Sequence, residues 1–117
     1  MSDSRRYHSF ILRANGKIEA LPPSSKAPSY DVLSKAVGGM IETIPHWTTF
    51  EHLGVRYTRG VAYCNENGLT ERRPYNPLAT HCWRHACPLG DPARMTLLGD
   101  VIFYAKEPRA TKVESAQ

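Results

Sequence analysis

The densest group of side chains able to do chemistry lies in residues 81–87, which read HCWRHAC. If this stretch is helical, His81 and His85 share a face, and Cys82 lies close to His85 because it precedes it by three residues. Imidazoles and thiolates are the ligands of structural zinc, although the sequence lacks the Cys-x-x-Cys pair common in such sites. One hypothesis is a zinc-stabilised module with the ligands Cys64, Cys82, His85 and Cys87. The alternative is that Cys82 and Trp83 belong to the core and that the histidines lie on the surface.

The same cysteines and histidines are residue types used in nucleophilic catalysis. A cysteine hydrolase needs a base beside its thiol and a third group that orients the base, and no such third residue is visible in the sequence. Phosphate-binding glycine motifs are missing from the sequence, and its acids are scattered instead of paired. The sequence leaves open whether the protein is an enzyme, but it favours a binding protein without a cofactor.

Cations gather in the second half of the chain. Six arginines lie between positions 56 and 94, against three acids, in a chain of formal net charge +4. Such an excess favours anionic partners: nucleotides, nucleic acid or an acidic protein surface. Guanidinium groups grip phosphate, and aromatic rings stack on bases. The residues predicted to bind a ligand are Arg72, Arg73, Tyr75, Asn76, Trp83 and Arg84, with His81 and His85 beside them. The alternative is a solvated basic face.

Turn and cap residues define the elements of the first half of the chain. Strand-forming residues surround Asn15-Gly16, a dipeptide typical of tight turns, so residues 7–21 are predicted to form a hairpin. Three prolines in residues 21–29 predict a loop. Ser29 is the expected N-cap of a helix that ends at Gly38-Gly39.

The second half is predicted to hold strands and one further helix. Alternating apolar and polar residues predict a strand at 40–47 and one continuous strand at 54–64. A helix fits only residues 77–86, where Pro77 takes a first-turn position. The compact apolar run VIFY within residues 95–107 predicts a buried strand.

Together these elements predict a single α+β domain. Residues 7–106 would form a small, mainly antiparallel sheet of four to five strands with one or two helices packed on one face. A mixed sheet with one parallel neighbour is equally compatible. Residues 1–6 and 107–117 are predicted to be flexible tails.

Composition predicts a cytoplasmic location, in the host cell if the gene belongs to a phage. No apolar run approaches the length of about 20 residues that crosses a bilayer, so no membrane partner is expected. The first ten residues, MSDSRRYHSF, do not form a secretion signal. Three cysteines in such a chain are expected to be reduced thiols. The oligomeric state stays open, a homo-oligomer included.

Several short motifs resemble a known family. A helix runs into Val37–Glu42, followed by an asparagine-containing hairpin at Asn65–Leu69, an Asn-x-x-Ala segment at Asn76–Ala79 and a glycine-bearing strand at Gly99–Tyr104. Over residues 7–106 this order resembles the small phage, plasmid and bacterial proteins catalogued as domain of unknown function 3846. The resemblance implies an accessory protein of a mobile genetic element. The histidine and cysteine cluster departs from the family pattern.

These observations lead to a hypothesis about function. The chain is predicted to be a non-enzymatic binding protein of a phage or plasmid, an inhibitor or sponge that sequesters a host protein or a nucleotide-like anionic ligand and so counteracts host defence. The alternatives are a nucleic-acid-binding accessory protein and the zinc-stabilised module. The hypothesis expects the segment between the Asn67-Gly68 turn and the last strand to fold onto the sheet as a cation-lined surface.

Overall fold

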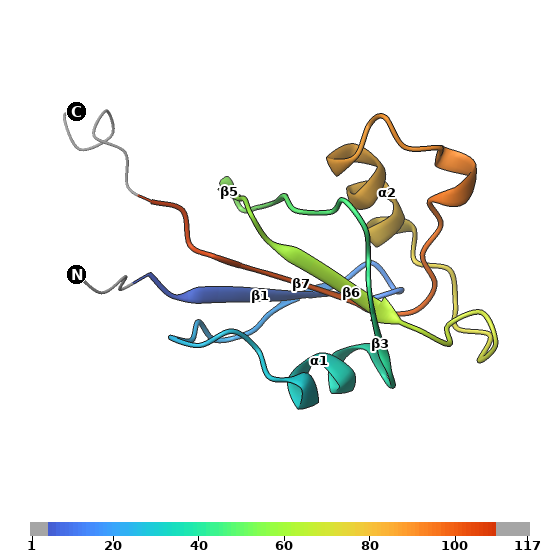
Figure 1. Ribbon diagram of the computed structural model, residues 1–117, viewed down its shortest axis with the longest axis horizontal. Coiled ribbons are helices and arrows are strands. Elements are labelled where there is room, and N and C mark those ends of the chain that lie inside the picture. The colour runs from blue at the N-terminus through green and yellow to red at the C-terminus, as the bar shows by residue number, and fades with distance from the viewer. Residues whose placement is uncertain (1–4, 110–117) are drawn as a thin grey trace.

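The computed structural model describes residues 5–109, and its centre is a five-stranded sheet (Figure 1). The strands lie in the order β2-β1-β7-β6-β3, and every neighbouring pair in the described part of the chain is antiparallel. Their bounds are Tyr7–Leu12 for β1, Ile18–Ala20 for β2, Ile41–Thr43 for β3, Val61–Asn65 for β6 and Val101–Lys106 for β7. The predicted α+β class with a mainly antiparallel sheet is therefore confirmed.

The first two strands form the hairpin that the sequence predicts. Gly16 has a φ of 91°, a left-handed conformation that glycine adopts without steric cost. The Asn15 side chain accepts a hydrogen bond from the Lys17 amide at 3.0 Å, which closes the turn. On its other side β1 pairs with β7 along its whole length, so the first and last strands of the described chain are neighbours.

Both helices form where the sequence predicts them. Helix α1 spans Tyr30–Val37; the Ser29 hydroxyl accepts a hydrogen bond from the Val32 amide at 3.3 Å, and Gly38 ends the helix with a φ of 78°. The hydroxyl cap and the left-handed glycine satisfy backbone groups that a helix leaves unpaired at its ends. Helix α2 spans Pro77–Ala86.

The two helices pack on opposite faces of the sheet, which corrects the expectation of one covered face (Figure 1). Helix α1 packs against Ile11 and Ile102. Helix α2 places Ala79 in the cluster that contains Leu12 and Val101. Successive residues of a strand point to opposite faces, and both faces of β1 and β7 carry apolar side chains. Each face of the sheet therefore needs its own packed element that shields the apolar side chains from water.

The prediction of one continuous strand at residues 54–64 is wrong, because the chain breaks between two strands that belong to different sheets. Its first part, β5 (Val55–Tyr57), pairs with β4 (Phe50–His52) in a separate two-stranded sheet, and only its second part is β6. Gly60 lies at the break, where a Cβ atom would overlap the Phe103 ring. The backbone passes so close to β7 that only glycine fits there.

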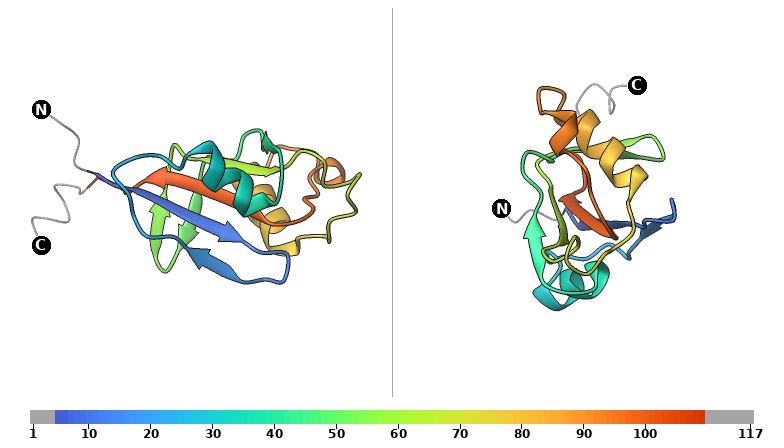
Figure 2. Two further views of the ribbon diagram at one scale, coloured as in Figure 1. Left: turned by 90° about the horizontal axis from the view of Figure 1, so that it is seen from below. Right: turned by 90° about the vertical axis from the view of Figure 1, so that its right-hand side faces the viewer.

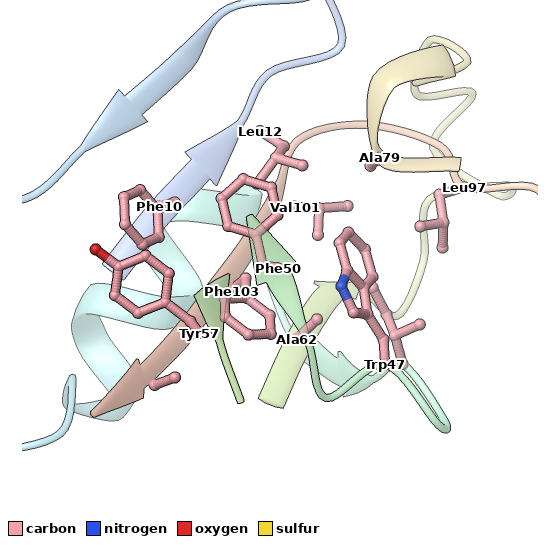
Figure 3. Packing of buried hydrophobic residues seen from close by; sticks show 12 residues of the cluster. Phe10, Leu12, Trp47, Phe50, Tyr57, Ala62, Ala79, Leu97, Val101 and Phe103 are labelled. Carbon is pink, nitrogen blue, oxygen red and sulfur yellow. The ribbon is translucent and has the colours of Figure 1, made fainter. Parts of the chain in front are cut away.

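The β4–β5 hairpin completes the core beside helix α2 (Figures 2 and 3). Phe50 and Tyr57 place their ring centroids 5.3 and 5.1 Å from the Phe10 ring, and Phe50 lies 5.5 Å from Phe103. Trp47 is buried next to them and donates a hydrogen bond from its indole to a backbone carbonyl oxygen. Tilted aromatic pairs of this kind stabilise a small core beyond the area that they bury.

Most of the two predicted tails, residues 1–6 and 107–117, lies outside the described residues. In the described part, the Glu107 amide donates to the Arg6 carbonyl oxygen at 2.8 Å, so these two residues continue the β1–β7 pairing by one hydrogen bond. None of the helices in residues 5–109 is long and apolar enough to cross a membrane.

Candidate functional site

The arginine segment, residues 72–94, contains all six side chains predicted to bind a ligand. Four of the six form hydrogen bonds to other groups of the protein, and the first of these is Arg73. Its guanidinium pairs with the Glu71 carboxylate at 2.9 Å and donates to the Gly38 carbonyl oxygen at 2.8 Å. The Glu71 carboxylate thus neutralises the positive charge of Arg73. The hydrogen bond to Gly38 ties the turn before Arg73 to the C-terminal end of helix α1, where the helix dipole favours a cation.

Asn76 is fully buried, so its predicted role in ligand binding is wrong. Its side-chain amide donates to the carbonyl oxygens of Leu12 and Gly99 at 2.9 and 2.8 Å, and its oxygen accepts from the Ala79 amide at 2.9 Å. Asn76 caps helix α2 and joins that helix to the end of β1 and to the bend before β7. An asparagine directly before a helix-starting proline is a capping pattern, and this pattern could have revealed the role from sequence.

Trp83 and Arg84 also bind backbone carbonyl groups instead of facing a ligand. The Trp83 indole donates to the Pro45 carbonyl oxygen at 2.9 Å. Arg84 donates to the carbonyl oxygens of Met95 at 3.2 Å and Pro92 at 2.9 Å, and so holds the short 3-10 helix η1, Pro92–Arg94. Irregular segments leave carbonyl groups without strand partners, and these two side chains supply the missing donors.

Arg72 and Tyr75 are the two members of the predicted set that stay exposed. Neither side chain has a polar partner among residues 5–109, and Tyr75 is 50% exposed. The pocket nearest to Trp83, of about 270 Å³, is lined by Glu42 and Glu66 as well as Arg94. The arginine segment therefore does not form the cation-lined surface that the sequence suggests.

The predicted zinc ligands do not come together. Among residues 5–109, no three histidine, cysteine or acidic side chains lie close enough to hold a metal ion, so a site built from Cys64, Cys82, His85 and Cys87 is wrong. Cys64 and Cys82 pack against the apolar core, whereas His85 faces solvent. The rings of His81 and His85 do stack, at 6.5 Å, as their spacing on one helix face predicts.

The core position of the two cysteines also determines their protonation. Burial, and to a smaller extent the charge of Glu42, raises the pKa of Cys64 to about 11. Burial likewise raises the pKa of Cys82. Thiols of this kind stay protonated at neutral pH and are poor nucleophiles.

The largest concentration of cations lines a groove at the end of the sheet where β1 begins and β7 ends. This basic groove has a volume of about 770 Å³. Five cations and one acid are among its lining residues, which are Arg5, Tyr7, Arg56, Thr58, Arg59, Tyr104, Ala105, Lys106, Glu107, Pro108 and Arg109. Three segments far apart in sequence supply them.

Sheet topology brings these segments together. Tyr7 and Lys106 lie opposite each other in the β1–β7 pair, which places both ends of the described chain at the groove. Strand β6 begins at Val61, opposite Tyr104, so the edge of β7 beyond Tyr104 has no paired strand on that side in residues 5–109. The link between β5 and β6 leaves the sheet at Gly60 and carries Arg59 to the groove wall.

Three of the groove cations are less tightly held than Arg73 and Arg84 of the arginine segment, whereas Arg5 donates to the Glu107 carbonyl oxygen at 3.5 Å. Arg59 and Arg109 have no side-chain partner among residues 5–109, and the nearest carboxylate to Arg56 is 3.7 Å away, with 65% of the Arg56 side chain exposed. The acid of the groove, Glu107, is itself hydrogen-bonded to His8 at 3.0 Å. This hydrogen bond is the main reason that the pKa of Glu107 is lowered.

Tyrosines lie beside the groove on the α1 face of the sheet. Tyr7 and Tyr104 line the groove and meet edge to face at 6.0 Å, and Tyr63 stacks on Tyr104 at 6.3 Å. The ammonium group of Lys106 lies 5.5 Å above the Tyr7 ring. Burial raises the pKa of Tyr104, as do the charge of Tyr63 and a hydrogen bond with it. Three neighbouring strands thus each contribute one ring beside the groove.

Comparisons with known proteins add no further constraint on this site. No protein-family model, curated protein or solved structure matches the chain. Sequence reasoning missed the basic groove because Arg5 and Arg109 fall in the predicted tails and Lys106 is the last residue of the predicted domain. Basic residues just before the first strand and just after the last are the pattern that could have indicated it.

Proposed function

We propose that this chain is a non-enzymatic binding protein whose basic groove binds a phosphate-bearing, nucleotide-like anion. The observation that carries the proposal is the charge of the groove: five cations line it, against one acid that is already hydrogen-bonded to His8. Clefts lined by one sign of charge concentrate ligands of the opposite sign.

The chemistry of the groove suits a nucleotide better than a simple anion. Guanidinium groups donate to phosphate oxygens in a fixed fork geometry, and four of the five groove cations are arginines. Tyr7 and Tyr104 add aromatic rings to the wall of the groove, against which a base can pack. The volume of about 770 Å³ lies in the range typical of small-molecule sites.

The biological role proposed for this binding is sequestration. A protein that holds a nucleotide-like signal without converting it lowers the free concentration of that signal, which is what a sponge does. The family resemblance implies that the gene belongs to a phage or plasmid and that the protein acts against host defence, and both remain predictions. A host protein with an acidic surface is the alternative partner, and this too remains a prediction.

Isothermal titration calorimetry with the full chain tests the proposal. ATP and a cyclic dinucleotide serve as probes, and we expect Arg59→Glu to weaken the one that binds by about tenfold or more, because a charge-assisted hydrogen bond contributes about 1.5 kcal/mol or more. Arg72→Glu is the matched control, since Arg72 and Arg59 share a φ of 55° and an exposed side chain. The proposal is wrong if neither probe nor a short oligonucleotide binds, or if both variants weaken binding equally.

A further inference from the structure

We propose that the ligand of the basic groove is single-stranded nucleic acid, which lies along the edge of β7 beyond Tyr104, where no strand of residues 5–109 pairs on the β6 side. This inference rests on the proposed function and deepens it, because it names the class of phosphate-bearing ligand. It is argued from how the cations are distributed, where the rings lie and which surface the helices occupy.

The groove cations are spread over three segments of the chain. Lys106 is the last residue of β7, and Arg109 follows three residues later. Arg5 precedes β1, and Arg59 approaches from the β5–β6 link. One phosphate group reaches only some of these cations, whereas a chain of phosphates can contact all of them.

Aromatic rings lie beside these cations on three neighbouring strands. Tyr7 and Tyr104 line the groove from neighbouring strands, and Tyr63 continues the row on the third. Proteins that bind single strands combine a positive groove that follows the backbone with aromatic rings on which bases stack. A base-paired duplex keeps its bases inside the helix and could not use these rings.

The position of the helices also argues against a duplex. Both α1 and α2 pack on the faces of the sheet, and none of the residues lining the groove belongs to a helix. A helix that enters the major groove is therefore missing from this site. An extended acidic peptide is the competing occupant of an unpaired strand edge, but it would gain nothing from the tyrosines.

Fluorescence anisotropy with a labelled ten-nucleotide oligothymidylate tests the inference on the full chain. We expect it to bind at least tenfold more tightly than ATP. The slope of log affinity against log salt concentration should approach −3.5, because each of five contacts contributes roughly −0.7. Tyr7→Leu should weaken binding about tenfold, the usual effect of losing one stacked base, whereas Tyr7→Phe should retain it.

Unlabelled competitors separate the possible ligands. Inorganic polyphosphate carries the charge without bases, and a ten-residue polyglutamate carries it on a peptide. The inference is overturned if either competes as well as the oligothymidylate, or if both Tyr7 variants bind like the unchanged protein. If ATP binds and the oligothymidylate binds no more tightly than ATP, the inference is also overturned, but the proposed function stands. Failure of ATP, the cyclic dinucleotide and the oligothymidylate to bind removes both.

Discussion

The arginine segment and the basic groove contain the same kind of residue and use it in opposite ways. In the segment, Arg73 and Arg84 point at carbonyl oxygens of Gly38, Pro92 and Met95. In the groove, Arg59 has no side-chain partner among the described residues. One region is held together by its arginines, whereas the other leaves Arg56, Arg59 and Arg109 exposed.

The difference comes from the backbone around each region. The arginine segment is largely irregular, so its neighbours leave carbonyl oxygens that no ladder pairs, and nearby guanidinium groups satisfy them. The groove lies at and beyond the ends of paired strands, where Arg59 of the β5–β6 link and Arg109 after β7 have no side-chain partner among residues 5–109. An arginine beside carbonyl oxygens that no ladder pairs is therefore a weaker candidate for ligand binding than one whose neighbours leave it exposed.

The largest effect should come from the arginine segment. Asn76→Ala removes a helix cap and leaves two buried carbonyl groups without a donor, so we expect a loss of about 3–4 kcal/mol in the free energy of unfolding. Urea denaturation measures it. Tyr75→Ala, a change at an exposed neighbour, should cost less than about 1 kcal/mol. A loss below 1 kcal/mol for Asn76→Ala would contradict the structural role given to this side chain.

Gly60→Ala should affect stability and binding together. The added methyl group meets the Phe103 ring, and overpacking of this kind costs about 1–3 kcal/mol. The same strain displaces Arg59, so oligothymidylate binding should fall as well. Gly68→Ala is the control, because a Cβ atom there would meet its neighbours only at 3.4 Å, an ordinary contact. Equal melting temperatures for the two variants would show that the close approach at Gly60 is not needed.

Two arginine truncations compare the regions directly. Arg84→Ala removes hydrogen bonds to two carbonyl oxygens, and we expect a loss of about 1–1.5 kcal/mol in the free energy of unfolding. Arg59→Ala should change stability by less than about 0.5 kcal/mol and act on ligand affinity instead. Chemical denaturation and anisotropy are measured on both variants. The contrast between the regions fails if Arg59→Ala is the more destabilising change.

The smallest effect concerns the acid of the groove. The pKa of Glu107 is lowered in the folded protein, chiefly by the hydrogen bond with His8, so its ionised form stabilises the fold. That contribution is present above the ordinary carboxyl pKa of 4.5 and is lost as the pH falls through the lower folded value. Melting temperatures of the unchanged protein and Glu107→Gln should therefore differ near pH 6 and converge towards pH 3. A constant difference would argue against this pair.

Elements defined by local chemistry could be predicted from the sequence. Asn15-Gly16 set the first turn, Ser29 and Gly38 bounded helix α1, and the apolar run of β7 marked the central strand. Each of these assignments depends on residues within one turn or one strand. The alternating pattern across Gly60 misled the strand prediction, because the Phe103 ring that forces the break belongs to a strand more than 40 residues away.

The candidate site could not be predicted in the same way. The roles of Arg73 and Asn76 depend on carbonyl oxygens at Gly38 and Leu12, which reach them only through the fold. The basic groove needs the pairing of β1 with β7, and no local pattern shows that Arg5 and Arg109 meet. Composition correctly indicated an excess of cations, but it could not show which of them lie close together in the folded chain.

The pairing of β1 with β7 also has a practical consequence for handling the protein. Arg5 and Arg109 both line the groove, so an affinity tag or fusion partner joined directly before Arg5 or directly after Arg109 would start at the proposed binding site. An acidic tag would compete with the ligand. The tip of the β4–β5 hairpin at Leu53, 88% exposed, is a better place for a label.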